Sequence, residues 1–219
     1  MSERSRENLA DAFAAISTGN ISDAMDQLGV CRAVIQGLNP LSYSQPRIAG
    51  WAYTVKQLPR HQTAEGYNLT RHSEVIDSLA APGDVVVIDT GGNMDVCTGG
   101  ALLASIAQKR GLRGFVVDGC LRDLKDIIDL GFPAHVRGAS PVRSAPDMET
   151  VGVNVPVLIG GVQVKPGDLI VADDSGVIAI SASLAEEVLH AALRIQENEK
   201  KLEQSIHEKY TRGIRYEKD

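Results

Sequence analysis

Residues 83–123 read GDVVVIDTGGNMDVCTGGALLASIAQKRGLRGFVVDGCLRD, and this stretch decides the fold class. Asp84–Asp89 and Gly114–Asp118 are short runs rich in valine and isoleucine, which is typical of strands buried on both faces. Between them, residues 100–110 carry apolar side chains at helical spacing, and Gly111 follows as a helix-ending residue. The alternation of strand, helix and strand predicts a parallel βαβ unit.

The pattern extends in both directions from this unit. On its C-terminal side we predict a helix over Asp123–Leu130, after a turn over Gly119–Arg122, and a third strand over Ala134–Arg137. On its N-terminal side we predict a strand over Ile48–Lys56 and a helix at about 65–80. Residues 138–180 change character, and we predict short antiparallel strands joined by turns at 152–157, 161–164, 168–172 and 176–180. The fold class is therefore α/β.

Helices are expected at both ends of the chain. Residues 1–30 hold two helices, the second with Ser22 as its N-cap and Gly29 as its end. Residues 183–207 form one long charged helix with a thin apolar stripe. No linker long enough to divide the chain is present, so we expect one domain over 1–219, with an α/β core at 48–180.

Composition excludes several classes of function. The chain has 219 residues and a net charge of −6, and 4% of its residues are aromatic, which argues against a nucleic-acid partner. The N-terminus has no apolar signal segment, and no apolar run reaches the ~18–20 residues that span a bilayer. The three cysteines are an odd number without a C-x-x-C pair, which indicates free, buried thiols. We therefore expect a cytoplasmic protein with neither a membrane nor a nucleic acid as partner.

Chemistry is expected where the two central strands end, because ligands of open α/β sheets bind beyond the carboxyl edge. Residues 99–103 open a helix there, and helix N-termini present unpaired amides to anions. Arg122 offers a planar fork for a carboxylate, and Asp123 is a hard oxygen ligand for Mg²⁺ or Mn²⁺. The simpler alternatives are glycines that only shape a turn and an Asp123 that only caps a helix.

The run GGALLASIAQKRGLRGFVVDGCLRD resembles the signature of the RraA-like family, which includes the 4-hydroxy-4-methyl-2-oxoglutarate (HMG)/4-carboxy-4-hydroxy-2-oxoadipate (CHA) aldolases. Other parts of the chain are similar to that family as well, and they are Ile21–Asp26, Gly50–Val55, Gly83–Gly92, Pro166–Asp168 and Asp173–Val177. The resemblance implies an α-β-β-α sandwich of the swivelling β/α/β type with a long C-terminal helix, assembled as a homotrimer or homohexamer.

The resemblance also implies roles for particular residues. A pyruvate-type 2-keto acid would lie against the amides of Gly100, Ala101, Leu102 and Leu103, and Arg122 would contact it. Asp123 would hold a divalent metal whose other ligands are largely waters, with Mg²⁺ expected first and Mn²⁺ or Co²⁺ as alternatives. Arg122 and Asp123 would be the catalytic residues.

The activity implied is that of a class II pyruvate aldolase, a carbon–carbon lyase that cleaves HMG or a related 4-hydroxy-2-oxo acid and also decarboxylates oxaloacetate. One alternative is an RraA-like regulator that binds a ribonuclease; such relatives lack the aspartate of the Arg-Asp pair, so Asp123 favours the enzyme. Another is a lyase of the same fold acting on a different sugar-acid-derived 2-keto substrate. Loops such as 57–68 and 138–149 would contact the distal end of that substrate.

The chain departs from the aldolases at one position, because Ala101 stands where they often have glutamate. The sequence therefore does not identify the residue that acts as the general base. An acid from the C-terminal helix of a neighbouring subunit is one candidate, with Glu199 first and Glu197 second, although a solvated helix face is the simpler interpretation of both. His61 and His72 flank a loop at the border of the predicted site, where lone histidines are more often surface or core groups.

Overall fold

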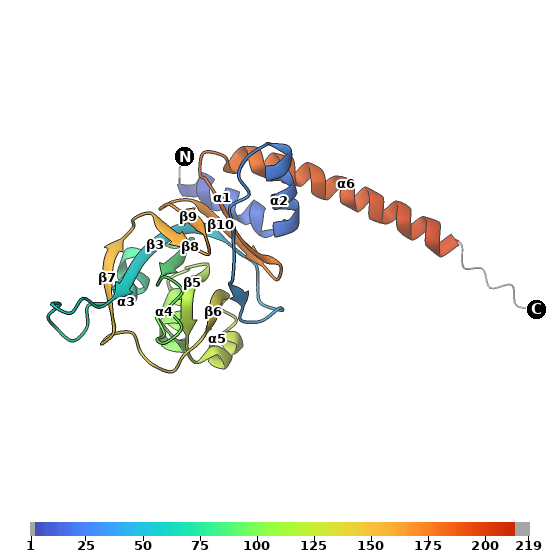
Figure 1. Cartoon of the computed structure of the whole chain (residues 1–219). Helices are drawn as coiled ribbons and strands as arrows, with labels where there is room; N and C mark the ends of the chain where they lie inside the picture. Colours follow the sequence, from blue (N-terminus) through green and yellow to red (C-terminus); the bar gives the residue numbers. More distant parts are fainter. Residues whose placement is uncertain (1–2, 213–219) are drawn as a thin grey trace, which may run out of the picture.

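A mixed β-sheet is the centre of the computed structural model, which describes residues 3–212 (Figure 1). Its strands are β1 (Val34–Ile35), β2 (Asn39–Pro40), β3 (Ile48–Pro59), β4 (Asp84–Asp89), β5 (Gly114–Leu121), β6 (Ala134–Ala139), β7 (Met148–Val153), β10 (Leu169–Asp173) and β11 (Gly176–Ile180). Their order is β1-β11-β10-β3-β4-β5-β6-β2, with β7 paired to β3, and β8 (Val157–Ile159) and β9 (Val162–Val164) form a separate pair. We predict a single domain over residues 1–219, of which residues 1–2 and 213–219 lie outside the described residues.

Helices cover the sheet in two groups. They are α1 (Glu3–Ala14), α2 (Thr18–Gln27), α3 (His72–Glu74), the π-helical turn η1 (Val75–Leu79), α4 (Ala101–Lys109), α5 (Leu124–Leu130) and α6 (Ala185–Arg212). The first group, η1, α4 and α5, packs on the parallel strands, and the second group, α1, α2 and the start of α6, packs on β3, β10 and β11. The predicted α/β class with a long C-terminal helix is confirmed.

The predicted βαβ units are present, since β4, β5 and β6 are parallel neighbours. Valine and isoleucine alternate between two cores along β4. Val86 and Ile88 pack with α4 and α5, whereas Val85 and Val87 pack on the opposite face with β8 and β9. Burial on both faces is the physical reason why the run is apolar without alternation in the sequence.

The antiparallel character of residues 138–180 is also confirmed, because β7 and β10 both run antiparallel to β3 and β10 pairs with β11. The strand predicted over 152–157 is wrong, since β7 ends at Val153 and β8 begins at Val157. Asn154 between them has a left-handed backbone with φ 55°, which no continuous strand tolerates. The amide of Asn154 donates to Thr54 O at 2.7 Å and so joins the turn to β3.

Two further boundaries differ from the predictions. The helix at about 65–80 begins only at His72, because the amide and hydroxyl of Thr70 both donate to Asn68 Oδ1 and hold the preceding residues in a turn. The turn over Gly119–Arg122 is instead a continuation of β5 as far as Leu121. A register shift between Val117 and Cys120 lets this end of the strand stay paired with β6.

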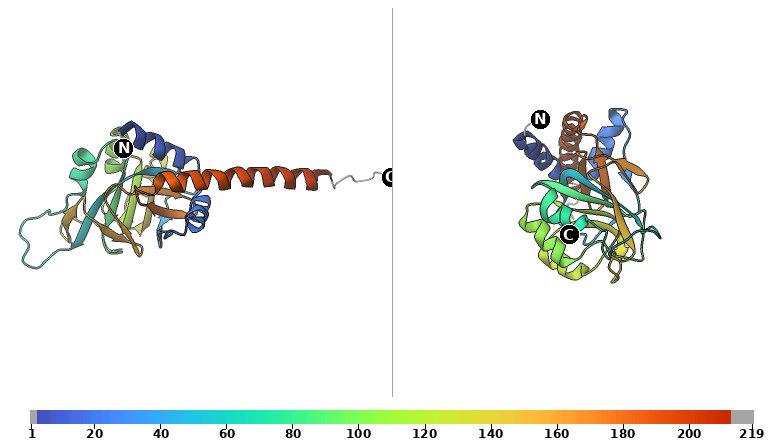
Figure 2. Two further views of the ribbon diagram at one scale, coloured as in Figure 1. Left: turned by 90° about the horizontal axis from the view of Figure 1, so that it is seen from above. Right: turned by 90° about the vertical axis from the view of Figure 1, so that its left-hand side faces the viewer.

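Ala185–Arg212 form a single helix, α6, that leaves the body of the molecule and extends beyond it (Figures 1 and 2). In its first turns the side chains of Val188 and Ala192 are buried, whereas Leu202 and Ile206 farther along the helix are exposed. None of the described helices is long and apolar enough to cross a membrane. All three cysteines are free thiols, with Cys97 and Cys120 buried as expected and Cys31 exposed.

The N-terminus of α2 is capped by two side chains, neither of which is the predicted Ser22. Ser17 is the N-cap, and its Oγ accepts from the amide of Asn20 at 3.1 Å. Asp173, at the end of β10, accepts from the amide of Thr18 at 2.9 Å and from its hydroxyl at 2.6 Å. The helix therefore begins four residues before Ser22, because a distant carboxylate supplies the acceptor that its first amide needs.

Replacing Asp173 by alanine should lower the free energy of unfolding by about 2–3 kcal/mol, because the buried amide of Thr18 loses its acceptor. Asp174→Ala, at an exposed position in the same turn, is the control and should change stability by less than about 0.5 kcal/mol. Urea unfolding followed by circular dichroism compares the two variants with the native chain. Equal midpoints for both variants would contradict the capping role of Asp173.

Candidate active site

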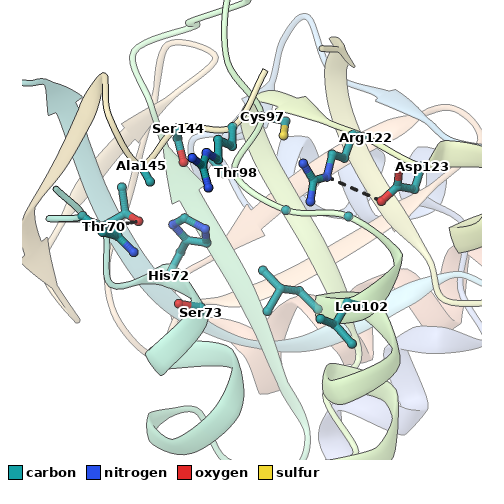
Figure 3. A pocket seen from close by; sticks show the side chains of 15 residues that line it. Thr70, His72, Ser73, Cys97, Thr98, Leu102, Arg122, Asp123, Ser144 and Ala145 are labelled. Carbon is teal, nitrogen blue, oxygen red and sulfur yellow. Dashed lines mark hydrogen bonds and ion pairs between the residues drawn. The ribbon is translucent and has the colours of Figure 1, made fainter. Parts of the chain in front are cut away.

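A pocket of about 270 Å³ opens where the end of β5 meets the start of α4 (Figure 3). Four segments form its walls, and they are residues 68–73, residues 97–103, the pair Arg122 and Asp123, and residues 143–145. Parallel pairing of β4 with β5 brings the second and third segments to the same edge of the sheet. The structure therefore places the helix start and the Arg-Asp pair, which the sequence analysis singled out, in one pocket.

The start of α4 presents unpaired backbone amides. Gly100 is the N-cap, and no side chain caps the helix. Within the described residues, the first helical hydrogen bond runs from Ala104 N to Gly100 O at 3.1 Å, and none is recorded for the three preceding amides. Gly100, Leu102 and Leu103 line the pocket, whereas Ala101 does not. An anion in the pocket would meet free N–H groups and the positive end of the helix dipole.

Arg122 and Asp123 lie side by side in the wall of this pocket (Figure 3). The amide of Arg122 donates to Gly99 O at 3.0 Å, which joins the end of β5 to the loop before α4. Arg122 Nε lies 3.6 Å from Asp123 Oδ2, and both side chains are about half exposed, at 49% and 43%. The pair is thus held next to the helix start and still accessible to a ligand.

The Asp123 side chain does not cap α5, although Asp123 occupies the N-cap position. Its backbone is left-handed, with φ 55° and ψ 38°, a conformation that costs free energy for a residue other than glycine. The simpler alternative from the sequence analysis is therefore confirmed for the N-cap position of Asp123, but the carboxylate does not accept from the first amides of α5. The carboxylate is instead beside Arg122 and lines the pocket.

The glycine at position 100 lets the side chains of Arg122 and Asp123 lie against the start of α4. A Cβ added to Gly100 would lie 2.5 Å from Asp123 Oδ2 and 2.9 Å from Arg122 Cγ. The described residues contain no group of three or more His, Cys, Asp or Glu side chains that could hold a metal. One carboxylate in an open pocket is unsuited to structural zinc but fits a Mg²⁺-like ion, which keeps several waters and needs few protein ligands.

The wall opposite Arg122 contains side chains to which the sequence analysis gave no role. His72 is buried, and burial lowers the pKa of its imidazole to about 4, so the ring is neutral at physiological pH. The Arg143 guanidinium stacks 5.2 Å from the centre of the Tyr67 ring and donates to its hydroxyl. No motif marks Arg143, because its place depends on tertiary hydrogen bonds that join Cys97 to Val142 and Ser144.

The other candidates lie away from the pocket within one chain. Glu199 Oε2 accepts from Asn20 Nδ2 at 2.8 Å, so it joins α6 to α2. Glu197 pairs with Lys201 at 2.7 Å, and this hydrogen bond lowers the pKa of the Glu197 carboxyl. Cys97 lines the pocket, but burial raises the pKa of its thiol, which disfavours a thiolate nucleophile.

Gly100→Ala should reduce any activity of this pocket at least about 100-fold without unfolding the protein, because the new Cβ displaces Asp123 and Arg122. The control is Gly19→Ala in α2, where a Cβ would meet only Ser17 Oγ at 3.7 Å and helix propensity would improve by about 1 kcal/mol. Pyruvate release and thermal unfolding should be measured for both. An active Gly100→Ala protein would show that the close approach of Arg122 and Asp123 to the start of α4 is not needed.

Comparison with known proteins agrees with this architecture. The sequence model described as RraA-like, Aldolase/RraA, matches residues 18–179. A Halalkalibacterium halodurans protein named "Putative 4-hydroxy-4-methyl-2-oxoglutarate aldolase" is 36% identical over 194 residues, which are 89% of this chain and 86% of that protein.

Solved structures show the same similarity. An uncharacterised Pseudomonas syringae protein superposes with a TM-score of 0.80 at 26% identity, covering 92% of both chains. Streptomyces coelicolor RraAS2, described as an unusual member of the RNase ES inhibitor RraA protein family, superposes with a TM-score of 0.78 at 28% identity, covering 88% of this chain and 94% of that one. This chain therefore belongs to the RraA-like family.

Proposed function

We propose that the protein is a divalent-metal-dependent pyruvate aldolase that cleaves HMG or a related 4-hydroxy-2-oxo acid and also decarboxylates oxaloacetate. The observation that carries the proposal is the pocket in which Arg122, Asp123 and the uncapped start of α4 meet. The name of the H. halodurans relative supports the aldolase class. The substrate is then a small 2-keto acid.

Each part of the pocket has a task in this reaction. The free amides at the start of α4 bind the carboxylate of the 2-keto acid and orient the 2-oxo group toward Arg122. The Arg122 guanidinium stabilises the negative charge that develops on that oxygen as the carbon–carbon bond breaks. Asp123 is the protein ligand of the divalent cation, with Mg²⁺ expected before Mn²⁺ or Co²⁺. The cation supplies Lewis-acid polarisation of the carbonyl.

Aldol cleavage also requires removal of the C4 hydroxyl proton, and Ala101 cannot do this. Among the described residues that line the pocket, Asp123 is the only acid. We propose that the base is an acid of a neighbouring subunit, Glu199 before Glu197, in a homotrimer or homohexamer. Decarboxylation of oxaloacetate has no such proton to remove, so a single chain already holds the groups that this simpler reaction needs.

Two other functions compete with the aldolase. A ribonuclease-binding regulator would resemble the description of the Streptomyces relative, but the exposed Asp123 beside Arg122 favours an enzyme. A lyase for another sugar-acid-derived 2-keto acid would use the same metal and arginine and differ at the wall formed by Asn68, Thr70, His72 and Arg143. We propose a cytoplasmic location for the enzyme, which its free thiols favour, since disulfides are rare in that reducing compartment.

Asp123→Asn should reduce pyruvate release from oxaloacetate and HMG to the rate that the native protein shows in EDTA, because the cation loses its anionic ligand. The matched control is Asp126→Asn, an exposed acid in the first turn of α5, which should keep the native rate. The assay couples pyruvate to lactate dehydrogenase with Mg²⁺ or Mn²⁺ present. Metal-dependent turnover by Asp123→Asn would remove this residue as the ligand.

Arg122→Ala should lower kcat by about 10²–10³, which is the loss typical of removing one donor to a developing oxyanion. Arg122→Lys should recover only part of this, because an ammonium is a point charge without the planar fork. Arg194→Ala, on the exposed surface of α6, is the control. A near-native kcat for Arg122→Ala would contradict the proposed role.

A further inference from the structure

A buried glutamine lies behind the wall of the pocket that faces Arg122. Gln57, near the end of β3, has no exposed surface. Its Nε2 lies 2.9 Å from His72 Nδ1 and 3.3 Å from Thr150 Oγ1. His72 itself lines the pocket, with its ring between Thr70 and Leu102 in Figure 3.

This contact determines which ring nitrogen of His72 carries the proton. With the Gln57 amide in this orientation its nitrogen faces the ring and donates, which makes Nδ1 of His72 the acceptor. The imidazole is buried and neutral, so its single proton is on Nε2. His72 therefore presents an uncharged N–H donor, and its acceptor lone pair is turned inward to Gln57.

The arrangement costs stability. Gln57 Oε1 has no hydrogen-bond partner, and it is the only such buried side-chain oxygen or nitrogen in the described part of the chain. A buried acceptor without a donor costs about 1–3 kcal/mol, so an apolar residue would suit this position in β3 better for folding alone. The cost is explained if the amide orients a group that touches the ligand.

The surroundings of His72 in the pocket are those of an oxygen-binding wall. Arg143 and Ser144 line it with His72 and offer further donors. Asp123, the only acid among the described residues that line the pocket, stands on the opposite side next to Arg122. A substrate whose carboxylate and 2-oxo group occupy the α4 and Arg122 end would extend its far oxygen atoms toward this wall.

We propose that Gln57 is a positioning residue that holds His72 as the Nε2–H tautomer, so that His72 donates to the distal carboxylate of the 2-keto acid. The inference rests on the proposed function for the identity of the substrate. It adds His72 as the protein group that distinguishes a diacid such as oxaloacetate from pyruvate. Gln57 does not touch the substrate and acts only through the orientation and protonation of the imidazole.

The tautomer can be measured without activity, by long-range ¹H–¹⁵N spectra of protein labelled with ¹⁵N-histidine at neutral pH. His135 is an internal reference, because its Nε2 lies 2.8 Å from the carbonyl oxygen of Asp173, which can only accept, and must carry a proton. His72 should give the same Nε2–H pattern as His135. An Nδ1–H pattern at His72 would overturn the proposal, because the amide of Gln57 would then accept rather than donate.

Gln57→Glu inverts the contact, since a carboxylate accepts from Nδ1–H, and it should move the His72 proton to Nδ1. Gln57→Met keeps the volume without a buried charge and should leave both tautomers populated, so it replaces Gln57→Glu if that variant does not fold. The matched control is Gln45→Glu, which places the same carboxylate beside a different histidine. Gln45 Nε2 lies 3.4 Å from Nδ1 of His135, outside the pocket. An unchanged His72 spectrum in both Gln57 variants would overturn the role of Gln57.

Kinetics then test what the tautomer does. Gln57→Glu or Gln57→Met should raise KM for oxaloacetate about 10- to 100-fold, with a smaller change in kcat. The inhibition constant of pyruvate, which lacks the distal carboxylate, should stay the same. An equal rise for both compounds, or a fall in kcat alone, would contradict distal recognition. If native protein does not turn over oxaloacetate, the proposed function fails, while the spectra still decide the tautomer.

Discussion

Parallel pairing of β4 and β5, from Val85 opposite Gly114 to Asp89 opposite Asp118, is the constraint on which the site depends. It ends both strands at one edge, so the loop that enters α4 and the residues that follow β5 must meet there. The hydrogen bond from Arg122 N to Gly99 O fixes this meeting, and only a glycine at position 100 lets the two segments approach so closely. Backbone pairing therefore brings the start of α4, Arg122 and Asp123 together before any side chain is oriented.

The pocket is less favourable for folding than the rest of the molecule. Asp123 has a left-handed backbone, α4 begins without a side-chain cap, and Gln57 Oε1 is buried without a partner. Each of these lowers stability, and all three border one pocket or the residues that line it. The apolar cores on the two faces of β4 and β5 offset this cost, since these strands are buried along almost their whole length. Backbone strain is not confined to the pocket, because Ala33 and Asn154 also have positive φ, but among the described residues only Asp123 combines it with a side chain that lines this pocket.

Ala101 changes what one chain can do alone. In the proposed reaction the groups around Asp123 bind and polarise a 2-keto acid, but the described residues that line the pocket include no second acid to take a hydroxyl proton. The proposed dependence on a neighbouring Glu199 makes aldol cleavage a property of the assembly, whereas decarboxylation depends on a single pocket. Within the chain, Glu199 already has a partner in Asn20, which it would have to share or release.

Local sequence determined the parallel strands, α4, α5 and the long C-terminal helix, because apolar periodicity and glycine signals act within a few residues. The same signals located residues 100–103 and the Arg122-Asp123 pair, since strand ends at one sheet edge follow from topology. Tertiary structure alone decided the start of α2, where Asp173 is 155 positions from Thr18, and the break between β7 and β8. The sequence also indicated the loops 57–68 and 138–149, but tertiary structure decided that Gln57, His72 and Arg143 are the side chains that meet at this wall, because only the folded sheet brings their segments together.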